Sequence, residues 1–216
     1  MKNLVSIASL VSVASLSLLL PAGSATAPPK PEIVLVHGAW EEANIWQAVT
    51  PLLKKDGYRV VTVTLPGRPS SPLSPDKVSL DLGNSDQDSK IGPHLQILKD
   101  KGIVTVEKSA RADLFGLDGN DQLRAEIPNL IVDEPLAPLA TPVHLTADRF
   151  GTVDKVYIHT AKDQVVSPSL QAIMVAATPV RKEITIDTGH TPFLIDPRGM
   201  ARDIEMAANP QKTASH

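Results

Sequence analysis

Three short loops of this sequence hold the residue types that general acid–base chemistry needs. The first is the turn His37-Gly38-Ala39-Trp40, in which Gly38 lets the chain turn sharply and the N–H of Ala39 can point toward a developing oxyanion. The second holds Asp163, a carboxylate that can orient an imidazole and stabilise its cation. The third holds His190, whose imidazole suits a general base. Together these residue types indicate oxyanion binding and proton transfer at one site.

Each feature also has an ordinary structural explanation. A lone carboxylate such as Asp163 often caps a helix or lies in a solvated turn. His190 fits a structural role about as well as a catalytic one, and Trp40 and Trp46 are typical core residues. Position favours chemistry, because each of the three loops follows a predicted strand, and ligands of parallel sheets bind outside the carboxyl ends of the strands.

The N-terminal elements that must position the first loop form one βαβ unit. Glu32–Val36 is an apolar run that predicts a strand buried on both faces. Asn44–Lys55 repeats apolar residues every three or four positions, which predicts a helix that ends at Gly57. Tyr58–Leu65 is rich in β-branched residues and predicts a second strand. Strand, helix and strand in this order predict a parallel sheet with helices.

The same alternation returns near the C-terminus and positions the other two loops. The expected elements are a strand at Asp154–Thr160, a helix at Ser169–Ala177, a strand at Lys182–Ile186 and a helix at Pro197–Ala208. Between the two ordered parts lie a Pro- and Ser-rich loop (66–82) and a segment (83–142) with short helical patterns at Ala110–Phe115 and Gln122–Ile127. The expected fold class is therefore α/β, with about four mostly parallel strands flanked by helices and a cap-like loop and helix segment.

Composition excludes several classes of function. The 216-residue chain has a formal net charge of −3, 42% hydrophobic residues and no Cys. A near-neutral charge without a basic run gives no support to nucleic-acid binding. Without Cys there is no thiol nucleophile and no Cys-ligated metal, and no His pairs with a second ligand at metal spacing. Because no nucleotide-binding glycine motif occurs either, we expect no metal and no cofactor.

The first 27 residues have the pattern of an export signal. Lys2 supplies the positive charge, Leu4–Leu20 is uncharged, and small residues follow up to Ala27. The alternative is an uncleaved membrane anchor, but about 17 apolar residues are at the short limit of a span. We therefore expect a signal peptide at 1–27 and a single domain at 28–216. The protein would then be periplasmic or secreted, with no stable membrane anchor after cleavage.

The longer sequence context resembles a known family. The stretches IVLVHGAW, GYRVVTVTLPGR, DSKIGPHLQI, PLAPLATPV, YIHTAKDQVVSPSLQ and TIDTGHTPFLIDP follow the order found in small serine esterases related to plant methylesterases and hydroxynitrile lyases. These belong to the α/β-hydrolase superfamily, and the resemblance runs from Glu32 to about Ala208. It implies that Ala39 lends an oxyanion N–H, with Gly38 and Trp40 in the same binding turn. It also implies that Asp163 is the triad acid and His190 the triad base.

The serine nucleophile of that family is missing. Such enzymes hold it in a G-x-S-x-G turn, and no such motif occurs here. Near Asp81–Gly83 the chain passes from the approach to that turn directly into the part that resembles the cap, so about 70 to 80 residues of strands and helices are absent by usual element lengths. Ser85, Ser109 and Ser167 are poor substitutes. Ser85 lacks the second Gly and precedes Asp86, and Ser167 is better placed to cap the next helix.

The resemblance thus implies an exported protein whose ancestral activity is hydrolysis of small carboxylic esters by a Ser-His-Asp mechanism, impaired here by the missing Ser. The alternative is a non-catalytic remnant that binds a small apolar or ester-like ligand. A third explanation is that the gap belongs to the sequence record. If central strands are missing, the remaining ones must pair anew, and we expect Glu32–Val36 to lie against Asp154–Thr160.

Overall fold

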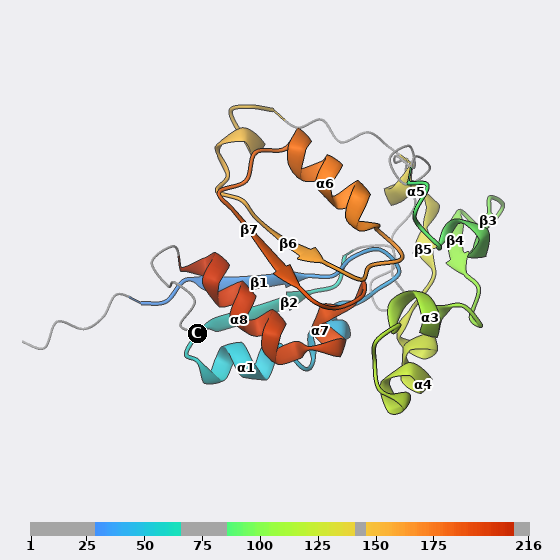
Figure 1. Cartoon of the computed structure of the whole chain (residues 1–216), viewed down its shortest axis with the longest axis horizontal. Helices are drawn as coiled ribbons and strands as arrows, with labels where there is room; N and C mark the ends of the chain where they lie inside the picture. The colour runs from blue at the N-terminus through green and yellow to red at the C-terminus, as the bar shows by residue number, and fades with distance from the viewer. Residues whose placement is uncertain (1–28, 66–85, 141–145, 210–216) are drawn as a thin grey trace, which may run out of the picture.

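The computed structural model describes residues 29–65, 86–140 and 146–209 (Figure 1). The predicted export signal, the loop 66–82 and Ser85 lie outside the described residues. Among the helices of the described ranges, none has the length and hydrophobicity that crossing a membrane requires.

The N-terminal βαβ unit forms as predicted, with one break in its helix. Strands β1 (Glu32–Val36) and β2 (Arg59–Val63) pair in parallel. The connecting segment is a 3-10 helix, η1 (Ala43–Trp46), followed by a short helix, α1 (Thr50–Lys55), rather than one continuous helix. Pro51 explains the break, because it has no N–H to donate to the preceding turn.

The C-terminal elements match the expected ranges closely. Strand β6 (Val156–Thr160) pairs in parallel with β7 (Lys182–Ile186). Helix α6 (Pro168–Ala177) connects them, and its N-cap is Ser167, whose Oγ accepts a hydrogen bond from the N–H of Leu170 at 3.2 Å. The chain then forms α7 and α8. Their bounds are Pro192–Ile195 and Pro197–Ala208.

The segment between the two units contains a small antiparallel sheet that the sequence did not predict. Strands β3, β4 and β5 pair in that order, and three short helices accompany them on one side of the molecule (Figure 1). The strands are β3 (Leu95–Leu98), β4 (Ile103–Val106) and β5 (Glu134–Pro135). The helices are α3 (Arg111–Phe115), α4 (Asp121–Leu130) and α5 (Leu136–Leu139), and the 3-10 turn η2 (Gly92–His94) precedes β3. A second 3-10 turn, η3 (Phe150–Thr152), lies later in the chain and precedes β6.

The predicted pairing of β1 with β6 is wrong. The four parallel strands form two separate two-stranded sheets, β1-β2 and β6-β7. The C-terminal helices bridge them instead, since α8 contacts both α1 and β7. Phe193 of α7 and Ala201 of α8 are buried in one cluster with Ile33 and Leu35 of β1. Non-directional apolar packing therefore joins β1 to the C-terminal helices, and the contact of α8 with β7 completes the link to the second sheet, where a hydrogen-bonded ladder was expected.

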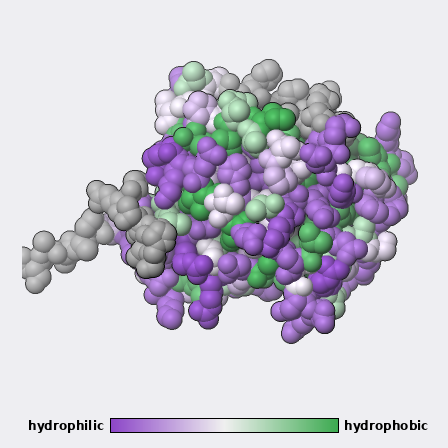
Figure 2. Space-filling model, in the orientation of Figure 1, coloured by the Kyte–Doolittle hydropathy of each residue, from purple (hydrophilic) through white to green (hydrophobic). Residues whose placement is uncertain are grey.

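Strand β1 is also buried on one face only, not on both as predicted. Ile33 and Leu35 face the helices, whereas Val34 is 57% exposed and Val36 is 45% exposed. The face of the molecule in Figure 2 is mostly hydrophilic, with hydrophobic residues in small separate areas. The gap between the sheets thus leaves an apolar strand face that a continuous, helix-covered sheet would bury.

Candidate active site

The structure brings the predicted acid and base together. Asp163 lies just after β6 and His190 just after β7. The Nδ1 of His190 lies 2.9 Å from Oδ2 and 3.1 Å from Oδ1 of Asp163. Because Nδ1 faces two carboxylate oxygens it carries the proton, which leaves Nε2 with the lone pair in the neutral imidazole. The His190 side chain is 22% exposed and that of Asp163 only 3%.

Local hydrogen bonds hold the Asp163 carboxylate in its charged form. The hydroxyl of Thr160 donates to Oδ2 at 2.8 Å, and the N–H groups of Val165 and Val166 donate to Oδ1 at 2.8 and 3.0 Å. Burial acts to raise the pKa of Asp163, but the hydrogen bond and charge of His190, with these donors, outweigh it. The pKa of Asp163 is therefore lowered.

The segment between the two units holds the loop of His190. The N–H of Gly189 donates to both carboxylate oxygens of Asp118 at 3.1 Å. The hydroxyl of Thr191 donates to the carbonyl oxygen of Phe115, whose ring meets the His190 imidazole edge-on at 5.4 Å between centroids. Sequence reasoning missed Asp118 and Phe115, and only the Asp118-Gly119 turn pair marks the place in the sequence.

The N–H groups of Gly38, Ala39 and Trp40, in the turn after β1, differ in their hydrogen bonding. The N–H of Gly38 donates to Oε2 of Glu41 at 3.0 Å, and the N–H of Trp40 donates to Oε2 of Glu134 at 2.7 Å. Within residues 29–65, 86–140 and 146–209, no acceptor bonds the N–H of Ala39. Of the three residues that the sequence places in a binding turn, Ala39 is thus the one with a backbone donor to offer.

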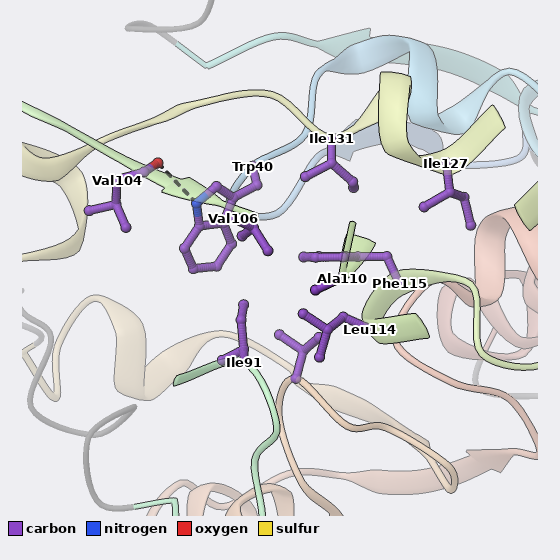
Figure 3. Close-up of a cluster of buried hydrophobic side chains, with 10 residues drawn as sticks. Trp40, Ile91, Val104, Val106, Ala110, Leu114, Phe115, Ile127 and Ile131 are labelled. Atoms are coloured by element: carbon purple, nitrogen blue, oxygen red, sulfur yellow. Dashed lines mark hydrogen bonds between the residues drawn. The ribbon is translucent and has the colours of Figure 1, made fainter. Parts of the chain in front are cut away.

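The structure places Trp40 in a hydrophobic core rather than on a binding surface. Its side chain is buried among residues of β4, α3 and α4, and its indole Nε1 donates to the carbonyl oxygen of Val104 at 3.2 Å (Figure 3). Its φ of 60° lies in the left-handed region, which residues other than Gly rarely adopt. Val165, two residues after Asp163, belongs to the same cluster, so one core supports both the turn and the Asp163 loop.

Two carboxylates determine the protonation of His190. Burial, the strongest single influence, acts to lower the pKa of His190. The hydrogen bond and charge of Asp163 and the charge of Glu41 together outweigh burial, so the pKa of His190 is raised. Sequence reasoning missed Glu41 and Glu134. The acidic pair that directly follows the His-Gly turn was the available signal for Glu41.

No nucleophile accompanies this pair in the part of the chain that the structure describes. No hydroxyl there forms a hydrogen bond with His190, whose side-chain partner is Asp163. Ser167 is buried, donates to Asp86 and caps α6, as predicted. Ser109 is exposed just before α3. The same ranges contain no group of three or more His, Asp or Glu side chains that could hold a metal ion.

Comparison with known proteins identifies the fold. No protein-family model and no curated protein matches the sequence. Among solved structures, polyneuridine aldehyde esterase matches with a TM-score of 0.71 at 16% identity, over 83% of this chain and 100% of that chain. A pyrethroid hydrolase from Sphingobium faniae JZ-2 matches with a TM-score of 0.64 at 17% identity, over 83% of this chain and 98% of that chain.

A methylesterase from Arabidopsis matches in the same way, with a TM-score of 0.62 at 18% identity, over 81% of this chain and 98% of that chain. All three are α/β-hydrolases, and each alignment runs over nearly the whole solved structure. The match agrees with the resemblance read from the sequence motifs. This chain has the α/β-hydrolase fold.

Proposed function

We propose that this protein is an exported hydrolase of small carboxylic esters in which Asp163 and His190 activate water. The observation that carries the proposal is the contact of His190 Nδ1 with both oxygens of a buried carboxylate, at 2.9 and 3.1 Å. This arrangement fixes the tautomer and stabilises the imidazolium that forms during catalysis. The esterases and hydrolases among the structural neighbours support the class of substrate.

The proposed reaction needs one base, one oxyanion donor and one water. Nε2 of His190 takes a proton from water while the water oxygen attacks the ester carbonyl carbon. The N–H of Ala39 stabilises the oxyanion of the tetrahedral intermediate. When the carbon–oxygen bond to the alcohol breaks, His190 returns the proton to the leaving oxygen, and the free acid and alcohol result. Asp163 stays ionised throughout.

The rate must be low, because water replaces a Ser held in a strained turn. A single oxyanion donor also stabilises the intermediate less than the usual pair. The lack of a G-x-S-x-G motif favours a second candidate function, in which the site binds a small apolar or ester-like ligand without converting it. Both candidates use the same site residues, and only turnover separates them.

The test is hydrolysis of p-nitrophenyl acetate by the purified chain and two variants. His190→Ala removes the base, and His94→Ala is the matched control, because His94 also contacts a carboxylate, Glu107, at 3.1 Å but lies in η2, just before β3. We expect the wild-type rate to exceed that of buffer, a loss of about 100-fold or more in His190→Ala, and no change in His94→Ala. A wild-type rate equal to that of buffer would favour the binding function, and equal rates in wild type and His190→Ala would refute the assigned base.

Export is a separate part of the proposal and has its own test. The uncharged run Leu4–Leu20 and the small residues after it support a cleaved signal. When the full gene is expressed in a bacterium, we expect the protein in the periplasmic or secreted fraction. Its mass should be lower than that of the full chain by the mass of the removed signal peptide. A full-length product in the cytoplasmic fraction would contradict export.

A further inference from the structure

Glu41 is a buried carboxylate at the site that the proposed reaction does not use. It is 2% exposed and directly follows the turn that carries the oxyanion donor. A carboxylate with so little contact with water requires hydrogen bonds or opposite charge around it. The groups around Glu41 therefore indicate its role.

The first neighbour is the turn itself. Oε2 of Glu41 accepts the N–H of Gly38 at 3.0 Å, and a side chain added at Gly38 would place its Cβ 3.2 Å from the same oxygen. The left-handed conformation of Trp40, which lies between them, belongs to this tight turn. The contact holds Gly38 and thereby fixes the direction of the Ala39 N–H that follows it.

The second influence of Glu41 is on the imidazole. Its charge, like that of Asp163, acts to raise the pKa of His190 against the effect of burial. The other charged or titratable groups around this site engage different partners. Asp118, Glu134 and His37 accept hydrogen bonds from the N–H groups of Gly189, Trp40 and Leu65, in that order. Lys162 pairs with Asp187 at 2.8 Å, and the charge of Asp163 acts on Tyr157.

We propose that Glu41 is a positioning residue of this site, whose carboxylate fixes the oxyanion turn through the N–H of Gly38 and adds its negative charge to that of Asp163 at His190. The inference rests on the proposed function, because it concerns the same site. Because the charge of Glu41 adds to that of Asp163 in favouring the imidazolium, His190 stays protonated to higher pH, and hydrolysis begins only at a pH where the imidazole is neutral.

The test is a titration of His190 by NMR, followed through its imidazole Cε1–H signal in the full chain. Glu41→Gln removes the charge but keeps an oxygen that can accept the Gly38 N–H. Glu42→Gln removes the same charge one residue further along and is the matched control. We expect the His190 midpoint to move to lower pH in Glu41→Gln and to stay in place in Glu42→Gln. The acidic limb of the ester hydrolysis profile should move in the same direction.

The titration does not need turnover, so it separates the two proposals. If no ester is hydrolysed but the midpoint still moves, the proposed function fails while the role of Glu41 stands. An unchanged midpoint in a folded Glu41→Gln variant would overturn the role of Glu41. Glu41→Ser, smaller but equally neutral, should give the same shift if Gln does not fit. Loss of cooperative melting in both variants would assign Glu41 a purely structural role and would also overturn the proposal.

Discussion

The contact between Asp163 and His190 couples two ionisations in opposite directions. Burial acts to raise the pKa of Asp163 and to lower that of His190. The hydrogen bond and the charge of the partner, together with neighbouring groups, outweigh burial in both, so the pKa of Asp163 is lowered and that of His190 is raised. The charged pair is therefore favoured in the folded chain over a wider pH range than in the unfolded chain. A pair of this kind contributes to stability only while both groups are charged.

The pair gives the pH dependence of unfolding a defined sign. The His190 contribution is complete below its ordinary pKa of 6.5 and is lost as pH rises through the raised pKa of the folded state. The Asp163 contribution is complete above its ordinary pKa of 3.8 and is lost as pH falls through the lowered pKa. In urea unfolding from acid to alkaline pH, the free-energy difference between wild type and His190→Gln should be largest between these values. A difference that keeps growing above pH 6.5 would contradict the assignment.

The buried contact between Trp40 and Glu134 predicts a cost in stability. Glu134→Ala leaves the Trp40 N–H without its acceptor inside the core, which should lower the free energy of unfolding by about 1–3 kcal/mol. Glu126→Ala is the control, because Glu126 is exposed and accepts a hydrogen bond from Gln122 in the same helix. Urea unfolding measures both variants, and equal stability in the two would show that the turn does not depend on Glu134.

Residue types at strand ends could be predicted from the sequence, but buried partners could not. Asp163 and His190 stand out because each directly follows a recognisable strand, and parallel strands bring such ends together. Glu41, Asp118 and Glu134 come from three different segments, and their contacts depend on how those segments pack. A single sequence carries no period or spacing that encodes such packing.

At the scale of elements, regular periodicity predicted the C-terminal half well. Helix α8 and strand β7 have the expected bounds, since each has a clear pattern and a sharp boundary. The hairpin of β3 and β4 was missed because each strand has only four residues, too few to distinguish a strand from a short apolar run. The break before α1 follows from Pro51. The regular spacing of apolar residues across this position predicted one continuous helix instead.

The bridge between the two sheets predicts a large effect of one side chain. Phe193 of α7 is 8% exposed and packs against Trp46 with ring centroids 4.8 Å apart and ring planes tilted by 53°. Phe193→Ala should lower the free energy of unfolding by about 3–5 kcal/mol, because it leaves a cavity between the β1-β2 unit and the C-terminal helices. Phe150→Ala, at a side chain that is 36% exposed, should cost much less. Similar midpoints of thermal melting for the two variants would show that α7 does not hold the sheets together.

At the scale of the whole molecule, the parallel strands form two separate sheets, which are linked through the C-terminal helices. The likeness to α/β-hydrolases spans nearly the full length of the solved structures, yet β1 and β6 do not pair. The strand pattern of the sequence predicted that β1 and β6 would pair, because it indicates how many strands there are but not how far apart they lie. Side chains of helices α7 and α8 instead pack against the β1-β2 unit and connect it to the C-terminal part of the chain.

The exposed face of β1 predicts self-association. Val34 and Val36 are 57% and 45% exposed on a strand that pairs along one edge only within the described residues, an arrangement that favours edge-to-edge contact between molecules. Val34→Lys should reduce light scattering of concentrated solutions while leaving the melting temperature nearly unchanged. Ile173→Lys, at a 60% exposed side chain of helix α6, is a control for added charge alone. Equal scattering by wild type and Val34→Lys would contradict a role for this face.

The central claim is that the acid–base pair of this site acts on water, without a serine nucleophile. The most direct measurement is the intact mass and the residual p-nitrophenyl acetate activity of the protein after treatment with a fluorophosphonate, which forms a covalent adduct with activated serines. We predict an unchanged mass and an unchanged, His190-dependent rate. A single adduct on one Ser, together with loss of hydrolysis, would contradict the claim.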